Sequence, residues 1–174
     1  MTKLLSTEQM AEFANSGCLF FEGLIDEDIN KEFLNDIGHT DIDDVDNIQH
    51  YFQNIKSSSS IPRIPAGTAL KDAYPLNSPL EKIFKNEIVS GAINSLVGSK
   101  TVVDHQFLHL TFPSKYYEKA NQRQMSQVNH QDSTIDPRTT FDIQLFYFPT
   151  AVTKEMGGTR YIPGTHLRIV NEMG

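Results

Sequence analysis

The sequence predicts an α+β fold, mainly β, in which a layer of helices packs on one side of a β-barrel core. Amphipathic segments with helix-capping residues are spread over residues 6–97, and apolar runs rich in β-branched and aromatic residues follow at 101–112 and 141–148. Helices and sheets each bury one apolar face, so helices that precede a set of strands are expected to cover one face of a sheet. No repeat or second domain is evident, and residues 1–174 are predicted to form a single domain.

The first predicted helix is bounded by recognisable end signals. Residues 6–9 read STEQ, a capping box in which the first side chain and the fourth bond each other's backbone N–H groups. Gly17 is suited to the left-handed conformation that ends many helices. We therefore expect a helix over 6–16, followed by a short strand over the apolar run 18–21.

The second predicted helix spans 26–37. Asp26 is a favourable N-cap residue, and Gly38 is placed to end the helix. Its apolar residues recur every four positions, which gives the helix one buried face. They are Ile29, Phe33 and Ile37.

The third predicted helix, over 79–97, has the strongest start signal in the chain. Ser78 takes the N-cap, Pro79 the first helical position and Glu81 the third. Gly98 is placed to end it. Its apolar residues are Ile83, Phe84, Ile88, Ile93, Leu96 and Val97.

Strands are predicted over the remaining apolar runs. Residues 101–112 and 141–148 are rich in β-branched and aromatic residues, and 158–162 leads into a Pro-Gly turn. In the first of these runs, His105 and His109 lie an even number of residues apart and should share one side of the strand. We interpret them as sheet residues, with a lining position in a cofactor pocket as the less favoured alternative.

The overall composition excludes several classes of function. The chain has 22 acidic against 15 basic residues and a net charge of −7, which argues against a nucleic-acid surface and against docking on an anionic membrane. Cys18 is the single cysteine, so no intrachain disulfide can form. The sequence contains no signal-peptide pattern and no apolar run long enough to cross a bilayer, and we expect a cytoplasmic protein.

Residues 130–132, His130-Gln131-Asp132, are the strongest candidates for chemistry. On an extended segment, side chains two apart lie on the same side, which brings the imidazole and the carboxylate together. This is two thirds of the 2-His-1-carboxylate triad that holds Fe(II) and leaves positions open for substrate and oxygen. An H-x-D triplet alone is common, and a polar surface loop is the alternative.

With its flanking motifs, the triplet resembles the phytanoyl-CoA dioxygenase family of iron(II)- and 2-oxoglutarate-dependent oxygenases. The family pattern is HQD, then a hydrophobic strand, a GGT-containing turn and IPG(S/T)H. The corresponding segments here are 141–148 (FDIQLFYF), 155–159 (EMGGT) and 162–166 (IPGTH). The start of the chain is also similar, with LSTEQ at 5–9 and an aromatic, glycine-containing stretch at 13–21.

The resemblance implies a double-stranded β-helix, a jelly-roll or cupin-like core flanked by N-terminal helices. It implies that His130 and Asp132 are catalytic metal ligands for Fe(II), and that 2-oxoglutarate is the cosubstrate, with molecular oxygen as the oxidant. The substrate would be a small organic molecule such as an acyl-thioester, an amino-acid derivative or a natural product. Gln131 and Phe146 match positions near the cosubstrate, with solvent exposure and core packing respectively as their alternatives.

The family's second iron-binding His and its 2-oxoglutarate-binding Arg lie on later strands, with no equivalent here. His166 could be considered as a replacement for the missing iron-binding His. However, the resemblance places it in the family's Pro-Gly-Ser/Thr-His turn, where the His has a structural role. We therefore expect the N-terminal part of such a dioxygenase domain. A double-stranded β-helix has about eight strands, so these residues alone should be partly ordered or poorly soluble and bind Fe(II) weakly. The alternative function is a non-catalytic binding domain or inactive fragment on the same barrel, lacking the third ligand.

Overall fold

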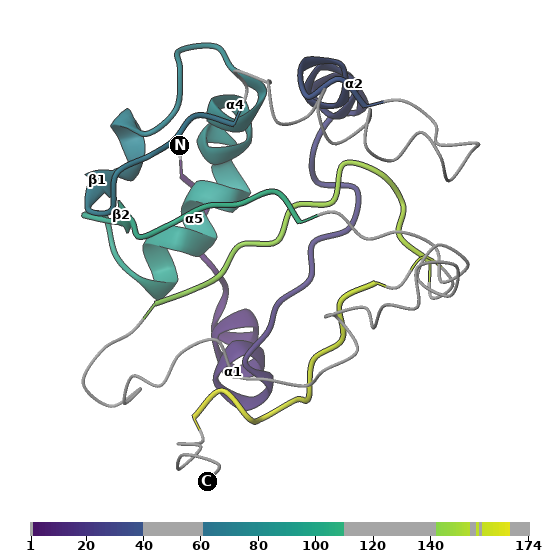
Figure 1. The fold of residues 1–174 in the computed structure, drawn as a ribbon. Helices are drawn as coiled ribbons and strands as arrows, with labels where there is room; N and C mark the ends of the chain where they lie inside the picture. Colours follow the sequence, from purple (N-terminus) through teal and green to yellow (C-terminus); the bar gives the residue numbers. More distant parts are fainter. Residues whose placement is uncertain (1, 40–60, 110–141, 154–155, 157, 168–174) are drawn as a thin grey trace, which may run out of the picture. The chain divides into compact units, whose positions relative to one another are not determined.

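The structure is a computed structural model of the chain, and it describes residues 2–39, 61–109, 142–153, 156 and 158–167 (Figure 1). The chain forms two compact units, and each is assembled from segments far apart in sequence. The first unit comprises Met1–Leu4, Gly23–Leu110 and Tyr147–Ala151, and the second comprises Leu5–Glu22, Thr111–Phe146 and Val152–Gly174. That the whole chain is one domain stays a prediction.

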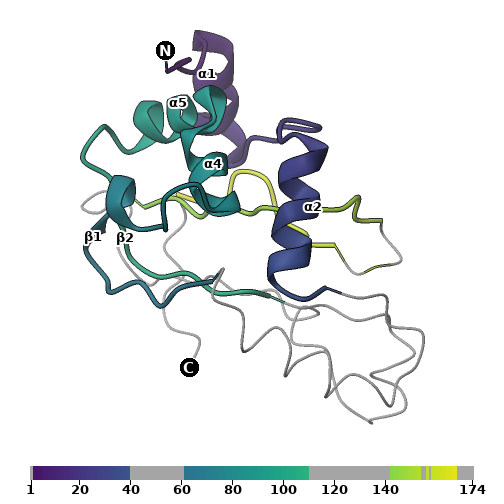
Figure 2. The ribbon, with the colours of Figure 1, turned by 90° about the horizontal axis from the view of Figure 1, so that it is seen from above.

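In the first unit, three helices pack in sequence order beside a short antiparallel sheet. Helix α2 packs against α4, and α4 packs against α5. Figures 1 and 2 show β1 and β2 beside α4 and α5. The elements are α2 (Glu27–Asp36), β1 (Thr68–Ala69), the 3-10 helix η2 (Leu70–Asp72), α4 (Pro79–Lys85), α5 (Glu87–Leu96) and β2 (Val102–Val103).

The core of this unit follows the predicted apolar faces. Phe33 and Ile37 of the second predicted helix are buried, as are Ile83 and Ile93 of the third. An ion pair of 2.5 Å between Lys82 and Glu32 adds a polar link between α4 and α2. The predicted start signal at Ser78 is confirmed, because its hydroxyl accepts a hydrogen bond of 3.2 Å from the Glu81 N–H.

The prediction of a single helix over 79–97 is wrong, because the chain forms two helices that meet at Asn86. This residue leaves the helical region, with φ −53° and ψ 132°. Its side-chain oxygen accepts hydrogen bonds from the N–H groups of Ile88, at 2.9 Å, and Val89, at 3.3 Å. Asn is a strong N-cap residue, and here its local hydrogen bonds begin a new helix inside a continuous apolar pattern.

The strand predictions are mostly wrong for the residues that the structure describes. Of the run 101–112, only Val102 and Val103 form a strand among the described positions, and β2 pairs antiparallel with β1 in the register Thr68 with Val103. Residues 18–21, 142–148 and 158–162 form no sheet with other residues that the structure describes. An apolar, β-branched run favours a strand, but the strand also requires a hydrogen-bonded neighbour. The double-stranded β-helix stays a prediction.

The second unit contains helix α1 (Thr7–Ser16) among its described residues, with both predicted ends confirmed. The Ser6 hydroxyl accepts from the Gln9 N–H at 3.2 Å, and the Gln9 side chain accepts from the Ser6 N–H at 2.9 Å. Gly17 ends the helix in the left-handed region with φ +80°. Within the part of the chain that the structure describes, no helix is long and apolar enough to cross a membrane.

The N-terminal segment of the first unit lies directly against α5. The N–H of Lys3 donates a hydrogen bond of 3.0 Å to the carbonyl oxygen of Glu87. Gly91, which is buried in the middle of α5, faces the Lys3 backbone, and a Cβ atom placed there would overlap the Lys3 carbonyl group. Glycine is therefore required at this position by a close approach of backbone to backbone.

Replacing Gly91 by Ala is expected to release the N-terminal segment from α5 while leaving the helix intact. Ala in a helix interior stabilises it by about 0.5–1 kcal/mol relative to Gly, but the added methyl group excludes Lys3. Trypsin should then cleave after Lys3 faster than in the unaltered protein. Asn94→Ala, also in α5 and without a side-chain hydrogen bond among the described residues, is the control, and Ser95 is avoided because its hydroxyl donates to the Gly91 carbonyl oxygen at 2.8 Å. Equal cleavage rates in the Gly91 and Asn94 variants would contradict the close approach.

Candidate functional site

The predicted metal ligands His130 and Asp132, and Gln131 between them, lie outside the residues that the structure describes. Their geometry therefore stays a prediction. The described segments that follow this motif in the sequence are 142–153, residue 156 and 158–167, which contains the turn at 162–166. They show how the chain around the candidate motif is held.

The turn at residues 162–166 is built by its own hydrogen bonds. Gly164 adopts φ +75°, which glycine reaches without strain. The Thr165 hydroxyl donates to the carbonyl oxygen of Ile162 at 2.8 Å. The Gly164 N–H donates to the carbonyl oxygen of Ser16 at 2.9 Å, and so attaches the turn to the C-terminal end of α1 within the second unit.

His166 completes this attachment through its ring. The imidazole packs on Gly17, where a Cβ atom would lie 2.5 Å from the ring Cγ and 2.8 Å from the His166 Cβ. Its ring centroid is 6.3 Å from that of Phe13 on α1. Within the described part of the chain, the Nδ1 atom is buried without a hydrogen-bond partner. This packing fits the structural role expected for His166, and among the described residues His166 belongs to no group of three or more His, Cys, Asp or Glu side chains that could hold a metal ion.

Residues 142–148, which follow the H-x-D motif in the sequence, include an exposed aromatic residue, Phe146, and a packed aromatic residue, Tyr147. Phe146 is 58% exposed, and whether it lies near the cosubstrate or packs in the core stays a prediction. Tyr147, in the first unit, packs edge-on against Phe33 with ring centroids 5.3 Å apart. Its hydroxyl donates to the side-chain oxygen of Asn30 at 2.6 Å, and burial raises the pKa of Tyr147 to about 12. The Tyr147 hydroxyl is thus a hydrogen-bond donor rather than a base at neutral pH.

His105 and His109 lie on one side of the chain, as their spacing predicts. The ring of Phe107, between them, stacks on His105 with centroids 5.9 Å apart and contacts the His109 ring at 6.2 Å. All three side chains are exposed, and His105 Nδ1 lies 2.7 Å from an oxygen of Asp104. Across the described part of the chain, no three His, Cys, Asp or Glu residues converge as a metal site would require.

The Pro-Gly-Thr-His turn seated on α1 and the H-x-D triplet of the sequence are the features that suggest an oxygenase type of protein. The chain belongs to the phytanoyl-CoA dioxygenase (PhyH) family, whose model matches residues 13–173. This match confirms the family predicted from the motifs. No curated protein and no solved structure showed a significant match.

Family membership establishes the general activity. Proteins of this family are dioxygenase-type enzymes and generally depend on Fe(II) and 2-oxoglutarate. Such enzymes act on a small-molecule substrate together with oxygen. The matched range includes residues 130–132 and the turn at 162–166.

Sequence reasoning misses the contact that holds the turn in place. The sequence indicates Gly17 only as the end of a helix. Because glycine has no side chain, Gly17 also leaves the space that the His166 ring occupies. The two residues are far apart in sequence, and a helix-ending glycine gives no sign of what packs on it. Only the structure relates them.

Proposed function

We propose that the protein is an Fe(II)- and 2-oxoglutarate-dependent dioxygenase that hydroxylates a small organic substrate. The observation that carries the proposal is the family match over residues 13–173, which includes the H-x-D triplet at 130–132. The proposed fold is a double-stranded β-helix with the N-terminal helices packed on one side.

The donor set fits the proposed metal chemically. A neutral imidazole nitrogen from His130 and a carboxylate oxygen from Asp132 are the ligand types of non-haem Fe(II) sites. Metal binding requires the imidazole to be unprotonated and the carboxylate to be ionised. When bound, the metal would supply the chemistry that couples conversion of 2-oxoglutarate to succinate with oxidation of a substrate C–H bond.

The other residues of the proposed site orient the cosubstrate. Gln131 offers an amide that can both donate and accept hydrogen bonds, which suits a dicarboxylate. Phe146, which is 58% exposed, would supply an apolar ring beside the cosubstrate. The turn at 162–166 is proposed to keep the neighbouring backbone in place through its two attachments to α1, the Gly164–Ser16 hydrogen bond and the His166 ring on Gly17.

Titration with Fe(II) under anaerobic conditions tests the metal site directly. 2-Oxoglutarate is expected to strengthen Fe(II) binding by about tenfold or more, equivalent to about 1.4 kcal/mol, because it supplies additional donor atoms. Asp132→Ala should remove this effect, whereas Asp72→Ala, an exposed residue of η2, should not.

Two further results complete the test. His166→Ala is expected to leave Fe(II) binding unchanged, because its ring packs on Gly17. Loss of binding in that variant would make His166 a ligand and overturn its structural role. Fe(II) binding that is unaffected by Asp132→Ala would contradict the proposed site and favour a non-catalytic binding domain.

A further inference from the structure

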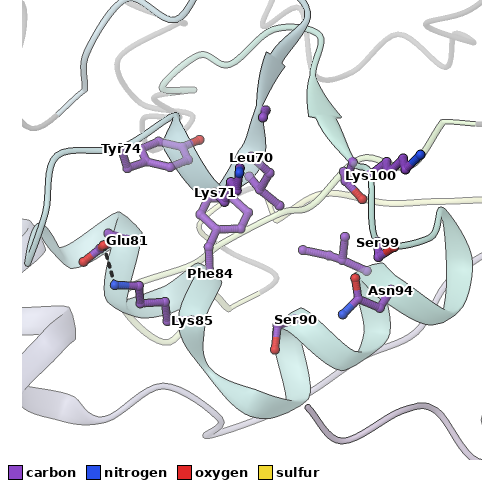
Figure 3. A pocket seen from close by; sticks show the side chains of 13 residues that line it. Leu70, Lys71, Tyr74, Glu81, Phe84, Lys85, Ser90, Asn94, Ser99 and Lys100 are labelled. Carbon is purple, nitrogen blue, oxygen red and sulfur yellow. Dashed lines mark ion pairs between the residues drawn. The ribbon is translucent and has the colours of Figure 1, made fainter. Parts of the chain in front are cut away.

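A second candidate site lies within the first unit, in a pocket of about 590 Å³ (Figure 3). It is bounded by η2 and the segment before β2 on one side and by α4 and α5 on the other. A volume of this size is in the range of pockets that hold small organic molecules. None of its lining residues belongs to the proposed iron motif or to the turn at 162–166.

The interior of the pocket is apolar and partly aromatic. Leu70 and Phe84 are half-buried in its wall and Ile93 is buried. The ring of Tyr74 stacks on that of Phe84 with centroids 4.9 Å apart and an angle of 15°. The Tyr74 hydroxyl is already used, since it donates to the side-chain oxygen of Gln106 at 2.8 Å. Tyr74 therefore presents its ring to the pocket, and a planar apolar group would find flat surfaces there.

The charged residues of the pocket are mostly positive. Lys71, Lys85 and Lys100 are exposed residues that line it, and Glu81 is the single acidic residue among those that line it. Glu81 pairs with Lys85 at 2.6 Å, and Figure 3 shows the two side chains turned toward each other. Lys71 and Lys100 have no acidic partner within 4.0 Å among the described residues. In a chain of net charge −7, the pocket thus carries a net charge of +2.

Two neutral groups near these lysines can also bind a ligand. The Asn94 amide and the Ser99 hydroxyl have no hydrogen-bond partner within the described part of the chain, and both line the pocket (Figure 3). By contrast, the hydroxyls of Ser90 and Thr101 donate to backbone carbonyl groups, at 3.3 and 2.6 Å. The available polar groups are therefore donors beside two unpaired cations.

We infer that this pocket binds a small organic anion that has an aromatic or other flat apolar body and a carboxylate or phosphate head. The apolar body would lie against Phe84, Leu70 and Ile93. The head would be held by Lys71 and Lys100, whose long flexible stems let the ammonium groups reach it. This inference goes beyond the proposed dioxygenase activity, because it assigns a ligand to residues that the iron site does not use.

The test is a binding titration by isothermal calorimetry without iron and without 2-oxoglutarate. Phenyl phosphate and benzoate are the two probes that combine a ring with an anionic head, and their relative affinities distinguish a phosphate from a carboxylate ligand. Inorganic phosphate carries only the anionic head and phenol only the aromatic ring, so these two serve as the partial probes. We expect both combined probes to bind at least about tenfold more tightly than either partial probe.

Charge variants identify the site of binding. Lys71→Gln and Lys100→Gln should each weaken phenyl phosphate binding about threefold, and together about tenfold, because each removes one exposed cation. Both side chains are exposed, so folding should be unaffected. Lys31→Gln, which removes an exposed cation paired with Glu27 on α2, is the matched control and should change nothing.

Three results would overturn the inference. One is equal binding by the unaltered protein and the double lysine variant. The second is inorganic phosphate binding as tightly as phenyl phosphate, which would show that the apolar wall contributes nothing. The third is displacement of phenyl phosphate by 2-oxoglutarate at equimolar concentration, which would place the anion in the oxygenase site. None of these results depends on whether the protein turns over 2-oxoglutarate, so this inference and the proposed function can fail separately.

Discussion

In a protein that carries the complete set of iron ligands, replacing His130 or Asp132 by Ala is expected to lower the rate of succinate formation from 2-oxoglutarate by about 10³-fold or more, equivalent to about 4 kcal/mol of transition-state stabilisation. Each substitution removes one of the two ligand side chains that the H-x-D triplet provides. The remaining ligand cannot keep Fe(II) in a defined geometry, since a metal site depends on the number and placement of its donors.

The controls separate loss of the metal from loss of the fold. His39→Ala and Asp72→Ala remove the same side-chain types at positions outside the motif, and both variants should retain activity. Thermal unfolding should give similar midpoints for all four variants. Succinate formation that persists in both the His130 and the Asp132 variants would rule out these residues as the iron ligands.

Replacing Gly17 by Ala is expected to destabilise the second unit by about 2–5 kcal/mol. Gly17 has φ +80°, and a residue with a Cβ atom in this left-handed conformation costs about 1–2 kcal/mol. The new methyl group would also overlap the His166 ring, and overpacking of this kind typically costs about 1–3 kcal/mol. The turn at 162–166 would have to move away from α1.

A matched glycine isolates the contribution of the ring. Gly98 has φ +88°, and no atom lies within 4 Å of the place that a Cβ atom would take, so Gly98→Ala should show the backbone cost alone. Urea unfolding measures both variants. His166→Ala in the Gly17→Ala background should recover much of the difference, because neighbouring substitutions are not additive. Equal losses for Gly17→Ala and Gly98→Ala would show that His166 does not pack on Gly17.

The helix ends are predictable because each is decided within a few residues. The capping box at Ser6 and Gln9 and the cap at Ser78 satisfy backbone N–H groups of the first helical turn, and both form as the sequence indicates. The break at Asn86 escapes prediction for a different reason. The apolar residues on both sides of Asn86 follow one continuous helical period, which predicts a single helix. Asn86 nevertheless acts as an N-cap and begins a second helix.

The strands cannot be predicted in the same way. A run such as 142–148 favours an extended chain through its apolar and aromatic residues, but pairing depends on a neighbour that can be distant in sequence. The one described sheet pairs Thr68–Ala69 with Val102–Val103, and residues 68–69 carry no alternating apolar pattern of their own. The register is therefore a property of the tertiary structure.

The sequence by itself determined the family, the H-x-D triplet, both ends of α1 and the start of α4, because each of these depends on residue types at short, fixed spacings. The tertiary structure alone decided which distant groups meet: His166 on Gly17, Lys3 on Gly91, and Lys71 and Lys100 at one pocket. These contacts have no local signal, since the groups share neither a helical turn nor a strand. They arise where the packing of whole elements brings backbone and side chains together.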